Sequence, residues 1–246
     1  MSQDICILTG ASRGLGLAMA RQLRARGQRL LTLSRQANAQ LDGPGVEQWA
    51  VDLSQPEQAA ARLRAWLAAL PRAEIGSLTL INNAASLATL APLGRIDAGE
   101  LSRALRVGLE APMLLIAAFL DASSDLSVPR KVLNISSGLG RFAMAGSAVY
   151  CAAKAGLDHL GRAVALEEAA RPNGARIVSL APGVIDTDMQ LQLRSADPQA
   201  FGERVRFASL KAEGRLDSAE AAAAKVLAWL DRPDFGANPI GDVREA

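Results

Sequence analysis

The chain has 246 residues, half of them hydrophobic, which suits one large domain with a sizeable core. Its 27 basic and 25 acidic residues leave a net charge of +2, which argues against a nucleic acid or an acidic membrane surface as the partner. Two cysteines without disulfide or metal-ligand spacing, no secretory signal pattern and no apolar run of membrane-spanning length predict a cytoplasmic protein without a metal site or membrane contact.

Short apolar runs alternate with helix-like segments along the whole chain. The predicted strands lie at residues 4–10, 28–34, 46–53, 77–84, 130–137, 175–183 and, more weakly, 238–243. The predicted helices lie at residues 15–26, 56–70, 99–120, 148–170 and 218–230. Most of the strands are apolar throughout, as in strands covered on both faces. The order predicts a single α/β domain over residues 1–246, a Rossmann-type doubly wound parallel sheet of about seven strands with helices on both faces.

A glycine-rich loop, TGASRGLG, follows the first predicted strand at residues 9–16. Its glycines permit a tight turn and a close approach of the backbone to a pyrophosphate, and the next helix offers free N–H groups. A purely structural turn is the alternative, but strand, loop and helix in this order are the context that a dinucleotide site requires. The loop predicts cofactor contacts from Gly10, Ser12, Arg13, Gly14, Leu15 and Gly16.

The second predicted strand ends in Ser34 and Arg35, where an acidic residue would bind the ribose 2′-hydroxyl of NAD. A second arginine, Arg13, lies in the glycine loop. Guanidinium groups bind phosphate oxygens through paired donors. Taken singly, each arginine is typical of a solvated surface; taken together, the two predict NADP(H), with its 2′-phosphate, as the cofactor.

Five further motifs extend the pattern: DL at 52–53, NNAA at 82–85, NISS at 134–137, YCAAK at 150–154 and PGVIDTDM at 182–189. Ser137 lies thirteen positions before Tyr150. With these motifs the chain resembles the short-chain dehydrogenase/reductase family over nearly its whole length. Within that family, YCAAK, ALEE, APGVIDTDMQ and LKAEGRL are most similar to the sepiapterin reductase and benzil reductase branch.

The resemblance implies a role for each matching residue. Ser137, Tyr150 and Lys154 would be catalytic, and the last two would also contact the cofactor. Asp52 and Leu53 would lie at the adenine, Asn83 and Ala84 with the adjacent Ala85 at the adenosine ribose, and Ile185 and Thr187 with the adjacent Pro182 and Gly183 at the nicotinamide.

Tyr150 and Lys154 are four residues apart, on one face of the predicted helix 148–170. The lysine ammonium favours the phenolate, so we expect it to lower the pKa of the tyrosine from its ordinary value of about 10. Tyr150 would then protonate the alkoxide that forms as hydride reaches a carbonyl carbon, while Ser137 holds the same oxygen. Such a pair also arises by chance, but Ser137 and the glycine loop favour the functional interpretation.

One position departs from the family pattern. The stretch RALRVGLEAP carries Gly108 where the family has an asparagine that helps to anchor a water of the proton relay. Glycine has no side chain for this task, and it destabilises a helix by about 1 kcal/mol relative to alanine. The departure concerns the proton relay and not cofactor binding.

Residues 188–216 show no clear pattern, and we expect them to form a substrate-binding lid, because ligands in open α/β sheets bind beyond the carboxyl ends of the strands. The candidates for either an apolar pocket or the core are Phe142, Met144, Met189, Leu193 and Phe201. Residues 111–120 and 152–166 are apolar on nearly all sides, which predicts coverage by a second subunit in a homodimer or homotetramer.

These features together predict an NADPH-dependent carbonyl reductase that acts on a small ketone or vicinal dicarbonyl, with Tyr150 as the proton donor. Two alternatives remain open. One is another oxidoreductase of the same fold, with a 3-oxoacyl or polyol substrate. The other is a weakly catalytic NADP-binding sensor or interaction protein, which Gly108 keeps open.

Overall fold

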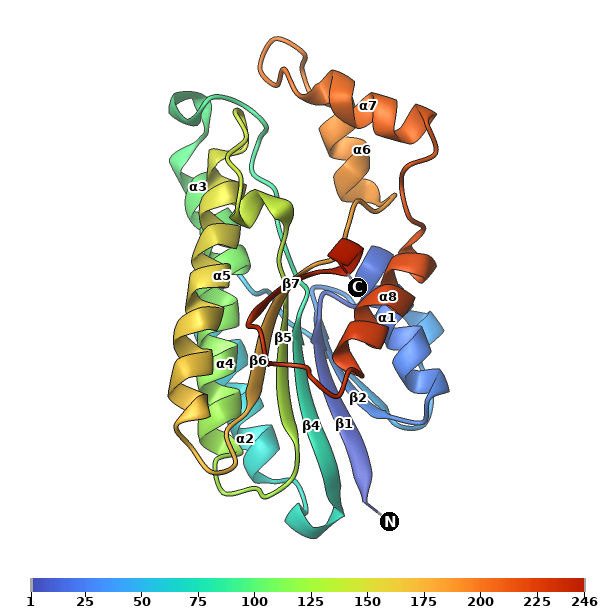
Figure 1. Ribbon diagram of the computed structural model, residues 1–246, viewed down its shortest axis with the longest axis vertical. Helices are drawn as coiled ribbons and strands as arrows, with labels where there is room; N and C mark the ends of the chain where they lie inside the picture. Colours follow the sequence, from blue (N-terminus) through green and yellow to red (C-terminus); the bar gives the residue numbers. More distant parts are fainter. Residues whose placement is uncertain (1, 246) are drawn as a thin grey trace.

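Seven parallel strands form one sheet in the order β3-β2-β1-β4-β5-β6-β7 (Figure 1). The computed structural model describes residues 2–245, so residues 1 and 246 of the predicted domain lie outside the described residues. The strands are β1 (Gln3–Thr9), β2 (Arg29–Ser34), β3 (Val46–Ala50), β4 (Ile75–Asn82), β5 (Arg130–Ile135), β6 (Arg176–Ala181) and β7 (Ile240–Asp242). The order reverses where β1 meets β4, and this is the switch point at which ligands bind in such sheets.

Helices cover both faces of the sheet (Figure 1). On one face α1 (Gly14–Ala25) packs against α8 (Ala219–Leu230). The other face carries α2 (Pro56–Ala68), α4 (Ala111–Ala122) and α5 (Ala148–Ala169). The prediction of a single Rossmann-type α/β domain, including its short last strand, is confirmed.

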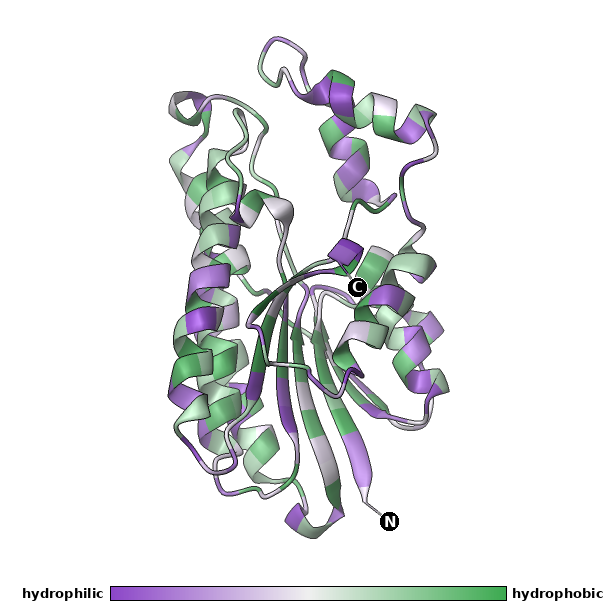
Figure 2. Ribbon diagram, in the orientation of Figure 1, coloured by the Kyte–Doolittle hydropathy of each residue, from purple (hydrophilic) through white to green (hydrophobic). Residues whose placement is uncertain are grey.

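The side chains of β1 show why the strands are apolar throughout. Successive side chains of a strand point to opposite faces of the sheet. Ile5 and Ile7 join the core beneath α2, α4 and α5, whereas Cys6 and Leu8 join the core beneath α1 and α8. Figure 2 shows the hydrophobic colour along the strands and α4. Burial on both faces therefore removes the alternation that a half-exposed strand would have.

The predicted helix 99–120 is divided into three segments. An α-helix, α3 (Ala98–Leu105), is followed by a π-helical turn at Arg106–Glu110 and then by α4. Gly108 is buried in this π-turn. A π-turn adds one residue to a helical turn and leaves the hydrophobic spacing on either side unchanged, so periodicity did not indicate it.

Residues 188–216 contain two helices, α6 (Asp188–Ser195) and α7 (Arg204–Ala212). They pack against each other beyond the carboxyl edge of the sheet (Figure 1). The segment is closed at its base, where the Asp186 backbone N–H donates to the Asp217 carbonyl at 2.9 Å and the Asp217 N–H donates to the Val184 carbonyl at 3.0 Å. The two helices therefore stand on a short paired stem.

Candidate active site

A cleft with a volume of about 1240 Å³ lies at the carboxyl edge of the sheet. Every catalytic and cofactor-binding residue that the sequence predicted lines this cleft: Gly10, Ser12, Arg13, Gly14, Leu15, Gly16, Ser34, Arg35, Asp52, Leu53, Asn83, Ala84, Ala85, Ser137, Tyr150, Lys154, Pro182, Gly183, Ile185 and Thr187. The structure thus gathers residues from the ends of six strands, β1 to β6, into one space.

The glycine loop is packed too closely for side chains at two of its glycines. Gly10 has a φ of +72°, and a Cβ there would lie 2.9 Å from Ala84 Cα. A Cβ at Gly16 would lie 2.1 Å from the Gly10 carbonyl oxygen. The loop therefore offers bare backbone at the start of α1, where N–H groups and the helix dipole favour a pyrophosphate, and these residues fit a dinucleotide.

Asn83 holds this loop in place. Its side-chain amide donates to the carbonyls of Thr9 and Gly10 at 3.0 and 3.1 Å, and its backbone N–H donates to Thr9 Oγ1 at 2.9 Å. The resemblance implied a contact of Asn83 with the ribose, but here the amide is bonded to the loop. Thr9 was not among the predicted site residues, although it is the first residue of the TGASRGLG motif.

The groups expected at a 2′-phosphate differ in their surroundings. Ser34 is buried, and its hydroxyl accepts the Ala11 N–H at 2.9 Å, so it also anchors the glycine loop. Arg35 is exposed. Arg13 lies 2.9 Å from the Asp188 carboxylate, and both side chains are about two-thirds exposed. Such a pair is weak and leaves other guanidinium donors available to an anion.

Asp52 lines the cleft just beyond the end of β3. Its carboxylate accepts the Ser54 backbone N–H at 2.9 Å. This bond, with the Ser54 hydroxyl, lowers the pKa of Asp52 below its ordinary value. The carboxylate is therefore charged at neutral pH and can accept from an exocyclic amino group.

Ser137, Tyr150 and Lys154 lie around the far end of the cleft. Ser137 follows β5, and its hydroxyl accepts the Leu139 N–H at 3.2 Å. Tyr150 and Lys154 lie on the first two turns of α5, with the lysine Nζ 5.6 Å from the centre of the tyrosine ring. Lys154 is buried, and its Nζ donates to the Ile135 carbonyl at 2.7 Å. One donor is thus occupied and two remain.

The expected lowering of the tyrosine pKa is not found. Burial raises the pKa of Tyr150 to about 12, and the nearby Ser137 hydroxyl opposes this only in part. Burial also lowers the pKa of Lys154 to about 8. The prediction was wrong because it counted the charge of the lysine and not the loss of water around both groups.

Gly108 lies against α5 beside this group. A Cβ at this position would lie 3.1 Å from Ala153 Cβ. The π-turn and the helix are therefore in close contact at the residue just before Lys154. A side chain at position 108 requires its neighbour to shift by a few tenths of an ångström.

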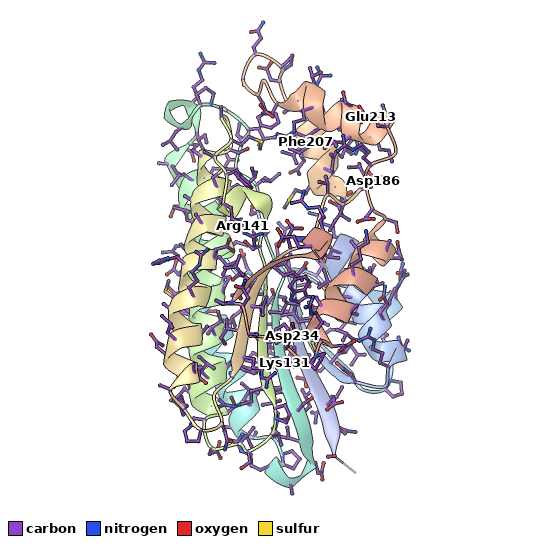
Figure 3. All side chains as sticks on the ribbon, viewed as in Figure 1. Lys131, Arg141, Asp186, Phe207, Glu213 and Asp234 are labelled. Carbon is purple, nitrogen blue, oxygen red and sulfur yellow. The ribbon has the colours of Figure 1, made fainter. Side chains whose placement is uncertain are left out.

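The opposite wall of the cleft comes from α6 and α7, and it mixes apolar side chains with polar and charged ones such as Gln192, Arg194 and Arg206. Residues that line it include Met189, Leu193, Phe207 and Leu210, and the facing loop adds Leu139, Phe142 and Met144. Figure 3 places Phe207 and Asp186 on this side and Arg141 beside α5. Of the apolar candidates, Phe201 is fully buried and stacks on Phe207 at 6.0 Å, so it belongs to the core and does not line the cleft.

Among residues 2–245, no group of histidine, cysteine, aspartate and glutamate side chains has the geometry to hold a metal ion. No helix in that range has the length and apolar character needed to cross a membrane.

Known proteins are similar to this chain in sequence and in fold. A family model described as short chain dehydrogenase matches residues 4–198. The benzil reductase ((S)-benzoin forming) of Bacillus cereus is 32% identical over 244 residues, which cover 96% of each chain. The sepiapterin reductase of Mus musculus is 34% identical over 250 residues, which cover 94% of this chain and 93% of the other.

Two solved structures extend the likeness to three dimensions. The KRED1-Pglu enzyme has a TM-score of 0.81 and 26% identity, with 97% of this chain and 100% of that chain covered. A metagenomic short-chain oxidoreductase in complex with NADP has a TM-score of 0.71 and 27% identity, with 98% and 95% covered. The family predicted from the motifs is confirmed, and the chain belongs to the short-chain dehydrogenases, with benzil and sepiapterin reductases among its relatives.

Proposed function

We propose that the chain is an NADPH-dependent carbonyl reductase that converts a compact ketone or vicinal dicarbonyl into the corresponding hydroxy compound. One observation carries the proposal. Ser137, Tyr150 and Lys154 line the same cleft as a glycine loop that fits a dinucleotide. A proton donor and a cofactor site in one cleft are what reduction of a carbonyl requires.

The preference for NADPH rests on charge. Arg35 is exposed at the end of β2, and Arg13 faces the same cleft from the glycine loop. The relative solved with NADP adds support, although another solved structure of the same fold, a 4-hydroxyisoleucine dehydrogenase, holds NADH. The proposed preference for NADPH therefore rests on the positive charge near the 2′-position more than on similarity to solved structures.

The cofactor and the protein supply different parts of the reaction, the hydride and the proton. A reduced nicotinamide, when bound, supplies the hydride that forms the new C–H bond. Tyr150 donates its phenolic proton to the carbonyl oxygen as the C=O bond becomes a C–O single bond, so that the product is a neutral alcohol. Ser137 donates a hydrogen bond to the same oxygen. Lys154, with its charge next to the phenolate so formed, stabilises it until a proton returns from solvent.

The substrate class follows from the walls of the cleft. Its substrate end carries the apolar side chains of Phe142, Met144, Met189, Leu193 and Phe207 beside polar ones such as Gln192 and Arg206. Such a wall suits alkyl or aryl groups on either side of a carbonyl. The name of the Bacillus cereus relative, a benzil reductase, points to an aromatic vicinal dicarbonyl. Benzil with NADPH is therefore the first substrate to test.

Tyr150→Phe is the main test, because it removes only the hydroxyl. We expect turnover of benzil to fall by at least about 10²-fold with NADPH affinity nearly unchanged. Cys151→Ser is the matched control on the next residue of α5, and it should keep most of the activity. Retained activity in the Phe variant would show that Tyr150 is not the proton donor.

A substrate panel separates the alternatives. Diketones, acyl thioesters and polyols, each with the matching cofactor form, distinguish a carbonyl reductase from a 3-oxoacyl or polyol oxidoreductase. Faster turnover of an acyl thioester or a polyol than of any diketone would replace the proposed substrate class. Tight NADPH binding without turnover on any of them would favour the sensor or interaction protein.

Gly108 gives that last alternative its structural basis, since no side chain there can hold a relay water. If the relay limits the rate, Gly108→Asn should speed turnover. The added Cβ would lie 3.1 Å from Ala153, so Gly108→Asn should be compared with Gly108→Ala, which adds the crowding alone. An unchanged rate in both stable variants shows that the relay is not limiting.

Two further proposals concern assembly and the lid. Met113 on α4 and Leu166 on α5 are 43% and 77% exposed, and a second copy of the chain covering these helices accounts for their apolar faces. Light scattering should give a dimer or tetramer, and Leu166→Glu should shift it towards monomer.

Residues 188–216 act as a lid, and their deletion should raise the KM for benzil more than the Kd for NADPH.

A further inference from the structure

A buried carboxylate lies directly beneath the proposed catalytic group. Asp158 is one helical turn beyond Lys154 on α5, and it is only 1% exposed. It was not among the residues that the motifs predicted. A buried acid is costly unless hydrogen bonds and opposite charge compensate for its lost water, so its surroundings need an explanation.

Those surroundings are the loop that carries Ser137. The Ser136 hydroxyl donates to one carboxylate oxygen of Asp158, and Arg141 Nε lies 3.3 Å from the other. Between them, a Cβ at Gly140 would lie 2.9 Å from that second oxygen, so the loop backbone is pressed against the carboxylate. Asp158 thus contacts both ends of the loop segment 136–141.

Arg141 connects this loop to β7, the last strand of the sheet. One of its terminal nitrogens donates to the Gly241 carbonyl at 2.9 Å, and the other lies 3.9 Å from the Asp242 carboxylate on β7. Asp242 also pairs with Arg244, a cleft residue. The loop, α5 and the last strand are therefore joined through Arg141, which pairs with the buried carboxylates of Asp158 and Asp242.

We propose that Asp158 is a positioning residue for the proposed reduction: it fixes the loop that carries Ser137 against α5, and its negative charge keeps Lys154 in the ammonium form. This inference rests on the proposed function. It assigns Asp158 no contact with substrate or cofactor. Its action goes through Ser137 and Lys154.

The charged groups around Lys154 set its protonation state. Burial lowers the pKa of Lys154, and Asp158 is the charged group that raises it again. Arg141 is balanced by Asp158 and Asp242. The other elements packed against α5 also carry charged side chains. Each of these is exposed to solvent, faces the cleft or is bonded to a partner other than Lys154: Glu100, Arg103, Arg106, Glu110, Asp121, Arg176 and Arg244.

The chain allows a direct titration. It has four lysines, at positions 131, 154, 211 and 225, so ε-carbon-labelled lysine gives few NMR signals, and Lys154→Met assigns the one of interest. In the unsubstituted protein the Lys154 signal should titrate near pH 8. In Asp158→Asn the midpoint should fall by about one pH unit or more, because the amide keeps the shape and removes the charge. This measurement does not require turnover.

Matched variants separate charge from packing. Ser136→Ala removes only the loop bond, so it should lower kcat for benzil and leave the lysine midpoint in place. Glu168→Gln changes another buried acid of α5, which is 4% exposed and bonded to Ala175, and it should alter neither. Arg141→Gln with Asp158→Asn removes the arginine that would otherwise lose one of its two carboxylate partners, and it should lower the midpoint as Asp158→Asn does.

The outcomes decide between the claims. An unchanged Lys154 midpoint in both the single and the double Asp158 variants overturns the proposal, as does a shift of the same size in Glu168→Gln. Full kcat for benzil in a stable Asp158→Asn variant overturns the positioning of Ser137. No turnover in any form would refute the proposed function, while the titration would still decide the link between Asp158 and Lys154.

Discussion

The two sides of the cleft, the proposed cofactor side and the proposed substrate side, are held in different ways. On the cofactor side, bare backbone and an amide fill the space: Gly10, Gly16 and Asn83 touch at distances that leave no room for a further atom. On the substrate side, α6 and α7 are joined to their stem by ion pairs of Asp186 with Arg194 and Lys211, all partly exposed. Exposed pairs contribute little, so the cofactor side is fixed and the substrate side is adjustable.

The largest expected difference between the two sides comes from a pair of glycine substitutions. Gly16→Ala would put a Cβ 2.1 Å from a backbone oxygen, whereas a Cβ at Gly202, between α6 and α7, meets nothing within 4 Å. We expect Gly16→Ala to lose roughly 3 kcal/mol of stability or more, together with NADPH binding, because backbone must move. Gly202→Ala should be near neutral. Urea unfolding and a fluorescence titration with NADPH check both, and equal effects would contradict the contrast.

A smaller effect is expected from the titration of Tyr150, the only tyrosine of the chain. Its phenolate absorbance in the cofactor-free protein should appear near pH 12, against about 10 on unfolding. Since the folded pKa is raised, the stabilisation is complete below pH 10 and is lost as the pH rises towards 12. Lys154 acts in the opposite sense, and stability should increase between about pH 8 and 10.5.

Tyr150→Phe should remove the first slope and Lys154→Met the second, in urea unfolding followed against pH. The two variants are controls for each other, because each keeps the other slope. Phenolate at neutral pH in the cofactor-free protein would instead support the lowered pKa that the motif alone suggested.

The preference between NADPH and NADH should change when Arg35, an exposed residue on the otherwise fixed cofactor side, is replaced. Arg35→Asp replaces a free guanidinium by a carboxylate that repels a 2′-phosphate and can accept a ribose hydroxyl. We expect the ratio of NADPH to NADH affinity to fall at least about tenfold, as for loss of one charge-assisted contact. Arg29→Asp at the start of the same strand is the control. Equal affinity of the unsubstituted protein for both cofactors would remove the basis of this prediction.

The smallest effect on stability is expected from Asp186→Asn. Its partners, Arg194 and Lys211, lower the pKa of Asp186, so the ion pairs persist at neutral pH and weaken only as the carboxyl is protonated in acid. The variant should leave the unfolding temperature and NADPH affinity nearly unchanged and raise the KM for benzil. A large loss of stability would mean that α6 and α7 belong to the rigid part of the molecule.

The same contrast explains what the sequence could predict. The strands and the glycine loop were found because burial on both faces and bare backbone restrict the residue types allowed there, as at Ile7 and Gly16. The helices α6 and α7 were not found, since no continuous apolar face defines them. The pKa of Tyr150 was misjudged because a spacing of four residues says nothing of burial. Asp158 was overlooked because its partners, Ser136 and Arg141, come from a distant loop.

The spacing along α5 has a practical consequence for redesign. Tyr150, Lys154 and Asp158 lie at intervals of four residues on one helix of 22 residues, so their separations follow from a rise of about 1.5 Å per residue and not from any loop. Apart from Phe142 and Met144, the residues that would select the substrate lie elsewhere in the chain, between 188 and 216. A mutant library confined to that segment should therefore change which carbonyl compounds are accepted while every member inherits the same proton-transfer geometry.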